Sequence, residues 1–160
     1  MNFIQRIRTG RLFSSHKEPN IIVKFTFMDK TYIINEFEIG FGQELNSKGQ
    51  PGGLPRGGIM TFTFTDTPDF YLNEWITRDD LLRDGIIRIL PNRHKIDEGA
   101  LLTISFADAY CIQYEKKIRT LEGGVYTTIV VSPRYIKIGN EEFENKWKEK
   151  EQLSHYIRSN

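Results

Sequence analysis

The feature that most constrains this fold is a two-residue alternation of apolar and polar side chains, which recurs over much of the chain. In Ile21–Met28, every second residue from Ile21 to Phe27 is apolar. Side chains of an extended strand point alternately to opposite faces, so this period predicts a β-strand. The same pattern predicts strands at 59–65, 86–90, 101–114 and 125–138.

Turn residues between these segments predict hairpins. Asp29-Lys30 separates the first strand from an extended stretch at Thr31–Phe41, in which Gly40 and Gly42 indicate a bulge or a bend. Glu122-Gly123-Gly124 precedes the last strand in the same way. The crossover helices that a parallel sheet requires are missing. We therefore expect a mainly β fold: an antiparallel β-barrel or sandwich of about six or more strands with one short α-helix.

The short helix is expected at about Pro68–Ile76. Thr67 supplies a capping hydroxyl, proline suits the first helical turn, and Asp69 places a negative charge near the positive end of the helix. Trp75 is expected to anchor this helix to the sheet.

The longest strand pattern, Leu101–Tyr114, separates large from small side chains. Asp108 interrupts the large face, and Pro133 in the last strand indicates a bulge or an edge position. We expect the small face to let another backbone or subunit approach closely. The large face comprises Leu102, Ile104, Phe106, Tyr110, Ile112 and Tyr114, and the small face Thr103, Ser105, Ala107, Ala109 and Cys111.

The composition argues against several classes of protein. The 160 residues fit one domain. With 22 basic and 21 acidic residues, the net charge of +1 gives no overall field that favours nucleic acid or an acidic membrane. No run of 18 apolar residues exists, and arginines interrupt the start where a secretory signal needs a continuous apolar segment. We expect synthesis in the cytoplasm, no nucleic-acid partner and no stable membrane insertion.

Catalytic and metal-binding patterns are not found. His16, His94 and His155 lack a second ligand at metal spacing, and no nucleophile signature surrounds the single cysteine, Cys111. The acidic pairs are adjacent residues, whose side chains point apart on an extended chain. We therefore expect neither an enzyme nor a bound cofactor.

The most unusual internal segment is Asn46–Gly58, with five glycines and two prolines. Glycine and proline at this density argue against a helix or a central strand. The spacing does not match a phosphate-binding loop, because no Gly-Lys-Ser/Thr follows and the next segment is a strand. Long loops without regular structure are usually functional or mobile, which favours an interaction loop.

The two ends differ from the middle of the chain. Residues 1–20 carry four basic side chains and one acidic one, a net charge of +3. They read either as a helix that binds a membrane surface or a partner, or as a frayed extension, and the short length favours the extension. The expected organisation is a basic extension at 1–20, a β-barrel domain at 21–147 and a charged tail at 148–160.

Four motifs in order resemble the Hcp-type tube proteins of type VI secretion systems, in their Bacteroidetes-type branch. Lys48–Gly58 resembles the loop before a strand in that family, and Asn73–Ile76 resembles its "EWM" helix. Phe106–Cys111 resembles its "F-x-D-A-Y-C" strand, and Ile138–Trp147 resembles its "I-G-N-A-E-H-E-N-x-W" ending. Together they cover about residues 21–147.

The resemblance implies a protein that assembles into hexameric rings, which stack into a tube driven out by a contractile sheath. Sheath, spike and effector proteins would be its partners, and export would need no signal peptide. Residues 1–20 precede the start of typical members, and Ser132–Tyr135 departs from their "S-A-R-E". The alternative is therefore a divergent paralogue that acts as a monomeric or dimeric adaptor or effector carrier.

Three segments are the candidate assembly sites. The loop is expected to contact neighbouring subunits or rings. The small face of the longest strand is expected to pack closely, and the segment Glu141–Trp147 is expected to dock on a sheet edge or a neighbour. The candidate interface residues are Lys48, Gly49, Pro51, Gly52, Gly53, Leu54, Arg56, Gly57, Gly58, Ala107, Ala109, Glu141, Glu142 and Trp147.

Overall fold

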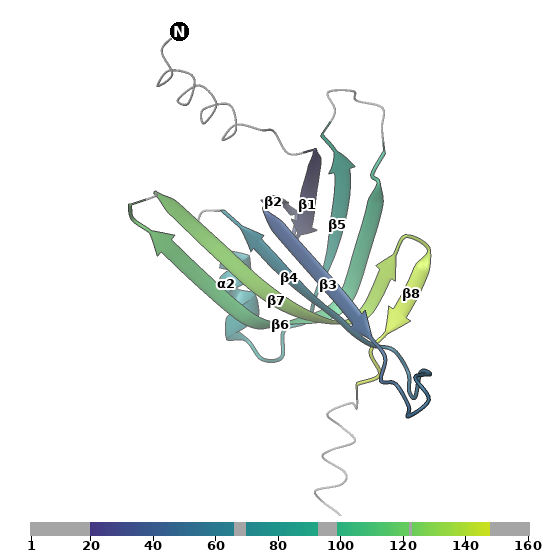
Figure 1. The fold of residues 1–160 in the computed structure, drawn as a ribbon. Coiled ribbons are helices and arrows are strands. Elements are labelled where there is room, and N and C mark those ends of the chain that lie inside the picture. Colours follow the sequence, from purple (N-terminus) through teal and green to yellow (C-terminus); the bar gives the residue numbers. More distant parts are fainter. Residues whose placement is uncertain (1–19, 66–69, 93–98, 122, 148–160) are drawn as a thin grey trace, which may run out of the picture.

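A computed structural model describes residues 20–65, 70–92, 99–121 and 123–147. Within these ranges, eight antiparallel strands form one curled sheet, a half-barrel with one short helix (Figure 1). This confirms the mainly β prediction. The elements are β1 (Ile21–Phe27), β2 (Lys30–Ile34), β3 (Glu36–Gly42), β4 (Arg56–Phe64), α2 (Phe70–Thr77), β5 (Arg83–Pro91), β6 (Leu102–Arg119), β7 (Gly124–Ile138) and β8 (Glu141–Glu144).

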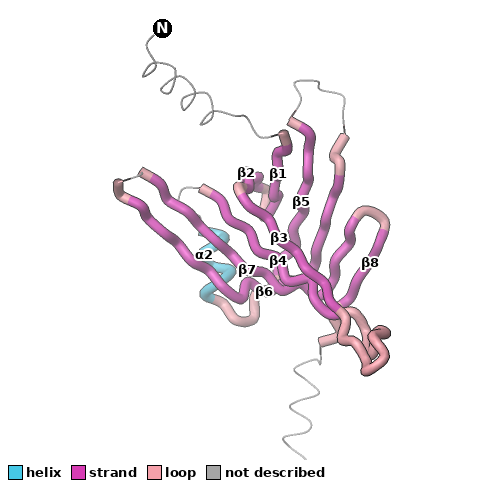
Figure 2. The backbone as a smooth tube through the Cα atoms, viewed as in Figure 1, coloured by secondary structure: helices cyan, strands magenta, loops and turns pink. Residues whose placement is uncertain are grey.

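The strands lie in the order β2-β1-β5-β6-β7-β4-β3, and β8 also pairs with β7. Two predicted hairpins are confirmed, β1 with β2 and β6 with β7. The bulge expected near Gly40 is confirmed as a register shift between Gly40 and Phe41 where β3 pairs with β4. Figure 2 shows the helix as the only one drawn in cyan among the described residues, lying beside the sheet.

Asn35 explains why the sheet curls. It stands between β2 and β3, which are consecutive in the chain but lie at opposite ends of the strand order. Its backbone N–H donates to the carbonyl of Thr63 (2.8 Å), and its side-chain Oδ1 accepts from the N–H of Thr65 (2.9 Å). The prediction of one extended stretch at Thr31–Phe41 is therefore wrong: the chain turns at Asn35 and its second half pairs with β4.

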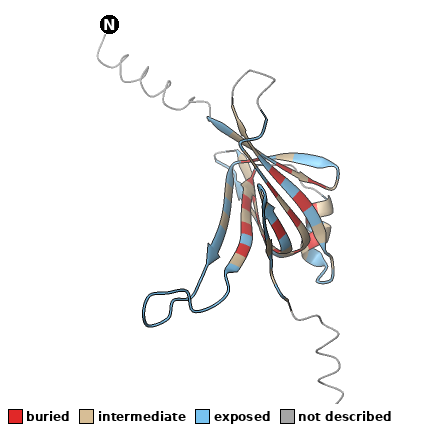
Figure 3. Ribbon diagram, turned by 90° about the vertical axis from the view of Figure 1, so that its right-hand side faces the viewer, coloured by how far each residue is buried: buried red, intermediate tan, exposed pale blue. Residues whose placement is uncertain are grey.

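The core is a cluster of aromatic rings on the concave side of the sheet. Phe25 lies 4.6 Å from Phe62 between ring centroids, and Trp75 stacks 4.7 Å from Phe27. All four side chains are fully or almost fully buried. The alternation of buried and exposed residues is visible along the central strands in Figure 3. Burial of large rings supplies most of the hydrophobic stabilisation that such a sheet requires.

The helix α2 fastens to this core through one residue. Trp75 is fully buried, and its indole N–H donates to the carbonyl of Ala109 over 3.0 Å. Leu72 also lies on the buried side. The prediction that Trp75 anchors the helix to the sheet is confirmed. Thr67, Pro68 and Asp69, the expected helix start, lie outside the described residues.

The side-chain faces of β6 differ from the prediction after Asp108. That residue has a φ of 52°, a conformation that reverses which side of the strand faces inward. A second shift lies between Cys111 and Gln113 in the pairing with β7. Consequently Ala109 is fully buried, whereas the Ile112 side chain is 52% exposed. The assignment of Tyr110 and Ile112 to the large inward face is wrong, and so is the assignment of Ala109 to the small outer face.

In β7 the alternation of buried and exposed residues is also interrupted, opposite Asp108 of β6. Thr127, Ile129, Val131 and Pro133 are buried, but the next buried residue is Ile136. Pro133 is therefore next to an irregularity, as expected, but not at the edge, because β6 pairs with β7 on one side and β4 and β8 on the other. The predicted domain boundaries stay predictions, because residues 1–19 and 148–160 are not described.

Candidate assembly site

The protruding loop between β3 and β4 is built around Asn46. Its side-chain Oδ1 accepts from the backbone N–H groups of Lys48 and Gln50, both at 3.0 Å. Its backbone N–H donates to the Gln50 carbonyl (2.8 Å), and Leu45 forms a β-bridge with Pro51. A short asparagine side chain that bonds its neighbours' backbone in this way fixes a turn. The loop is thus an ordered miniature hairpin, not the structureless segment that its composition predicts.

This loop offers side chains to a partner. Leu45 is 67% exposed and Leu54 is 73% exposed. The predicted loop residues Lys48, Gly49, Pro51, Gly52, Gly53 and Leu54 are all exposed. Because its backbone bonds already hold the loop, little conformational freedom remains to be lost when it binds.

The final three residues of the predicted loop instead belong to β4, which corrects the expectation that Asn46–Gly58 contains no central strand. Arg56 is exposed and lies 3.9 Å from Glu44. Gly57 has a φ of 134° and faces Phe41 at the bulge, and Gly58 is buried with a φ of 80°. A Cβ at Gly57 would overlap the Gly40 carbonyl oxygen of β3, and a Cβ at Gly58 would overlap the Ile136 side chain of β7. The two glycines therefore let β4 lie close to both neighbouring strands.

The two alanines of the predicted interface are separated by the reversal at Asp108. Ala107 pairs with Tyr135 of β7, which is 40% exposed, and it lies on the outward face. Ala109 is buried in the core, where its carbonyl accepts the Trp75 hydrogen bond. Its side chain is therefore not available to a neighbouring subunit.

The C-terminal segment docks on the edge of β7, as expected. Glu141 and Glu142 lie in β8, paired with Ile138 and Lys137. Trp147 packs 5.4 Å from the Tyr110 ring. The same segment also joins the base of the loop, which sequence patterns did not indicate.

Asn145 makes that junction. Its side-chain Nδ2 donates to the carbonyls of Gly57 (3.0 Å) and Pro133 (2.9 Å), and its backbone N–H donates to the Arg134 carbonyl (2.8 Å). One asparagine therefore ties β4, β7 and the C-terminal segment together. Asn145 falls within the Ile138–Trp147 motif, but the motif itself does not indicate that this side chain bonds β4 and β7.

Open sheet edges were also missed by sequence analysis. Among the described residues, β2 pairs only with β1 and β3 only with β4. From Tyr110 to Arg119, β6 pairs only with β7, because β5 leaves β6 at Ala109. Strand edges of this kind present unpaired backbone groups that can accept a further strand. Strand pairing depends on three-dimensional order, so composition could not reveal them.

The β3 and β6 edges carry opposite charges. Glu36 and Glu38 lie exposed on β3, which holds no basic residue. At the end of β6, Lys116, Lys117 and Arg119 outnumber Glu115, which forms an ion pair with Lys117 (3.1 Å), so this edge stays net positive. Opposite charges directly across a strand pair stabilise it, whereas like charges destabilise it.

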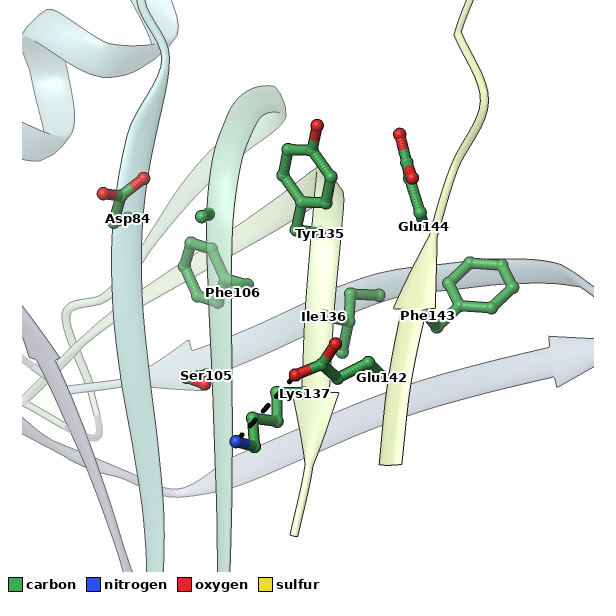
Figure 4. A pocket seen from close by; sticks show the side chains of 10 residues that line it. Asp84, Ser105, Phe106, Tyr135, Ile136, Lys137, Glu142, Phe143 and Glu144 are labelled. Carbon is green, nitrogen blue, oxygen red and sulfur yellow. Dashed lines mark ion pairs between the residues drawn. The ribbon is translucent and has the colours of Figure 1, made fainter. Parts of the chain in front are cut away.

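A shallow groove of about 590 Å³ lies on the outward face where β5, β6, β7 and β8 run side by side (Figure 4). Ser105 and Ala107 form its small-residue floor, and Tyr135 stands at its side. This groove contains the outward part of the small face that the sequence predicts, together with Glu142.

The remaining chemistry is sparse within the described ranges. Burial raises the pKa of the Cys111 thiol from its ordinary 9.0 to about 11, which disfavours the nucleophilic thiolate. No group of three or more histidine, cysteine, aspartate or glutamate side chains there could hold a metal ion. The helix in the described part of the chain is too short to cross a membrane. His16, His94 and His155 lie outside the described residues.

Known structures share this fold. Hcp1 from Flavobacterium johnsoniae is 26% identical, with a TM-score of 0.67, over 78% of this chain and 99% of that one. Hcp1 from Salmonella typhimurium is 12% identical, with a TM-score of 0.57, over 78% and 92% of the two chains. A chain of the sheath-tube complex of an extracellular contractile injection system (PVC) is 14% identical, with a TM-score of 0.52, over 81% and 96%. The two lower identities show a shared fold alone.

No match is found among curated protein sequences. The family described as Hemolysin coregulated protein Hcp (TssD), however, matches residues 19–148, which is most of the chain. The four motifs, the curled antiparallel sheet and this match agree. The chain belongs to the Hcp (TssD) family, the non-enzymatic tube proteins of type VI secretion systems.

Proposed function

We propose that this chain assembles into hexameric rings, and that the rings stack into the exported tube of a type VI secretion system and carry effectors. The family membership supports a tube protein. The mode of assembly is our inference from the surfaces described above.

The observation that carries the proposal is the pair of open edges with opposite charge. β3 and the second half of β6 are different surfaces, so a contact between them is head-to-tail. Head-to-tail contacts that close by rotation generate rings. When one edge accepts a strand of the next copy, backbone hydrogen bonds supply affinity, and Glu36 and Glu38 opposite Lys117 and Arg119 fix the direction.

The ordered loop is a second contact in this proposal. Its exposed residues from Lys48 to Leu54 reach beyond the sheet and would touch the next subunit or the next ring. Glu141, Glu142 and Trp147 would border the same contact, because Asn145 ties their segment to the base of the loop. Arg56 at the start of β4 would contribute a directed polar contact.

The partners follow from the tube role. A solved structure with the same fold comes from a sheath-tube complex, which supports a contractile sheath as the outer partner of this chain. A spike and effectors would complete the assembly. Synthesis in the cytoplasm and export by the machine accord with this role.

The first experiment is light scattering coupled to size-exclusion chromatography, with negative-stain images of the same peak. We expect a mass six times the 18.7 kDa of the chain, and ring-shaped particles. A protein that stays monomeric at high concentration, without rings and without contacts trapped by cysteine crosslinks, would contradict the proposal. It would favour the adaptor alternative.

Charge reversal tests the edges directly. E36K/E38K gives two basic edges and K117E/R119E gives two acidic ones, so each double variant should lose rings. The quadruple variant restores opposite charges and should regain them. The control D79K/D80K reverses two exposed charges in the turn after α2 and should leave rings intact. Rings that survive both edge variants would show that these edges do not form the contact.

A further inference from the structure

The outward groove has an excess of negative charge. Its lining includes the carboxylates of Asp84, Glu142 and Glu144 against one ammonium group, that of Lys137. Figure 4 shows these groups around the groove, with Tyr135 beside them. The other lining residues are Ser105, Phe106, Ala107, Ile136 and Phe143. The groove therefore combines a small-residue floor, an aromatic wall and an acidic rim.

These carboxylates keep capacity for further donors. Glu142 lies 4.0 Å from Lys137, and Glu144 lies 3.7 Å from the Nε of Arg134. Charge-assisted hydrogen bonds are about 2.7–2.9 Å long, so both pairs are loose. One oxygen of Asp84 accepts the Asp108 backbone N–H (3.0 Å). A carboxylate has about four acceptor positions, so a single bond leaves room for a cationic partner.

The chain itself contains a segment of matching charge. Residues 1–19 include Arg6, Arg8, Arg11 and Lys17 against Glu18 alone, and they include Phe3, Ile4 and Ile7. Guanidinium groups bind carboxylates in a directed way and stack on aromatic rings, which suits an acidic groove with a tyrosine wall. No other stretch of this length in the sequence has so high a net positive charge without lying in the sheet.

The basic segment enters the sheet far from the groove of its own copy. Asn20 accepts a hydrogen bond from Asn92 at the end of β5, whereas Asp84 lies at the start of that strand. The seven residue steps from Asp84 to Pro91 span about 23 Å. Nineteen residues can extend to about 65 Å, so length alone permits the groove of the same copy or of another.

Like charges stand on the path within one copy. Lys24 of β1 and Arg88 of β5 are paired in register and exposed, and Arg88 pairs with Thr103 on the face that also carries Ser105. A basic segment that ran back along β1 and β5 of its own sheet would pass both. A groove on a second copy can be reached without that repulsion.

We propose that the basic segment 1–19 of one copy docks in the acidic groove of a second copy. The contact needs only two copies in proximity. Among the groove residues, only Glu142 also borders the ring contact described above. This docking would link two copies in addition to the proposed contact between sheet edges.

Photo-crosslinking of the full chain tests this. The crosslinker p-benzoylphenylalanine replaces Ile7, which keeps every basic residue, and chains labelled with ¹⁴N and ¹⁵N are mixed before illumination. We expect mixed-label adducts that map to Ser105–Ala107 or Tyr135–Glu144. In E142Q/E144Q the yield should fall at least about twofold, because each exposed ion pair contributes a factor of about 1.4–5 and two carboxylates are removed. The control D79N/D80N removes the same charge in the turn after α2 and should not change the yield.

Each alternative outcome has a defined meaning. Adducts with a single label place the segment in its own copy, and adducts outside the groove place it elsewhere; both would overturn the proposal. An unchanged yield in E142Q/E144Q would do the same. If that variant fails to fold by circular dichroism, the unsubstituted groove is tested in about 1 M salt, where the Debye length is about 3 Å. A yield that persists there would also overturn the proposal.

Light scattering of the same samples separates this proposal from the ring. Rings without mixed-label adducts would support the tube function and overturn the docking of segment 1–19 in a second copy. Mixed-label adducts without rings would support the docking and contradict the ring proposal.

Discussion

Replacing Gly57 by alanine should destabilise the folded chain itself, although the sequence pattern places this residue at a contact between subunits. Two independent costs act at this position. Gly57 has a φ of 134°, and a Cβ there would overlap the Gly40 carbonyl oxygen and lie 2.8 Å from the Cα of Phe41. A sparsely populated backbone conformation costs about 1–3 kcal/mol, and overpacking against rigid backbone costs about 1–3 kcal/mol more.

Two other glycines of the same segment separate these costs. At Gly53 a Cβ meets nothing within 4 Å and the φ is not positive, so G53A should be neutral or stabilise by up to about 1 kcal/mol. At Gly49 the space is also open but the φ is 77°, so G49A should cost about 1–2 kcal/mol. G57A carries both costs, and we expect a loss of about 2–6 kcal/mol.

Urea unfolding followed by far-UV circular dichroism measures the series. The measurement is repeated at two protein concentrations, because association raises apparent stability by mass action. The expected order of stability is G53A, then G49A, then G57A. If G57A were as stable as G53A while it lost rings, the packing argument would be refuted and Gly57 would belong to the assembly contact.

Three further predictions concern single side chains. W75F removes the hydrogen bond to the buried Ala109 carbonyl and should cost about 2–4 kcal/mol in urea unfolding, whereas W147F, at the half-buried ring beside Tyr110, should cost less than about 1 kcal/mol. N145A removes the hydrogen bonds to the Gly57 and Pro133 carbonyls and should lower the free energy of unfolding by about 1–3 kcal/mol. Amide hydrogen exchange should then be faster in β8 than in β5. Equal exchange in both strands would argue against the role of Asn145 as the junction. Burial raises the pKa of the Cys111 thiol to about 11, so the folded chain should react with maleimide at pH 8 about a hundredfold more slowly than the chain unfolded in urea. The free energy of unfolding should also decline as the pH rises from about 9 towards 11, because only the unfolded thiol ionises in that range. Equal labelling rates in the two states would contradict the burial of Cys111.

Sequence patterns predicted those parts of the fold that depend on local regularity. The alternation in Ile21–Phe27 identified β1, and the glycines near Gly40 identified the bulge. The aromatic residue at Trp75 identified how the helix attaches. Each of these depends on the side chain's own character and on its immediate neighbours.

The errors arose where a backbone conformation carries no residue signature. Asp108 adopts a positive φ without being glycine, and this reverses the inward face of β6, so Ala109 enters the core. Asn35 ends one strand and begins another by bonding to β4, a partner about thirty residues away in the chain. The loop around Asn46 was expected to lack structure because of its many glycines and prolines. Composition does not reveal the hydrogen bonds from the Asn46 side chain to the backbone, which order the loop.

The open edges and the groove were beyond sequence reasoning for a different reason. Each consists of residues that pairing between distant strands brings together, such as Asp84 of β5 and Glu144 of β8 in the groove. Composition showed a neutral chain, and only the three-dimensional order separates its charges into an acidic edge, a basic edge and an acidic groove.

The strand order also governs when a newly made chain becomes competent to assemble. The pairs β3–β4 and β6–β7 can each form from neighbouring segments of the chain. The angle between the open edge of β3 and that of β6 is fixed only when β4 pairs with β7, as in Met60 opposite Val131. The pairing of β1 with β5 joins Ile21 to Pro91, which is similarly distant. Pairings between distant segments form late, because the chain must first close a long loop. A half-folded chain would therefore hold both edges at the wrong curvature. In the proposed ring it could not fit between its neighbours, so it would be excluded without a separate proofreading step.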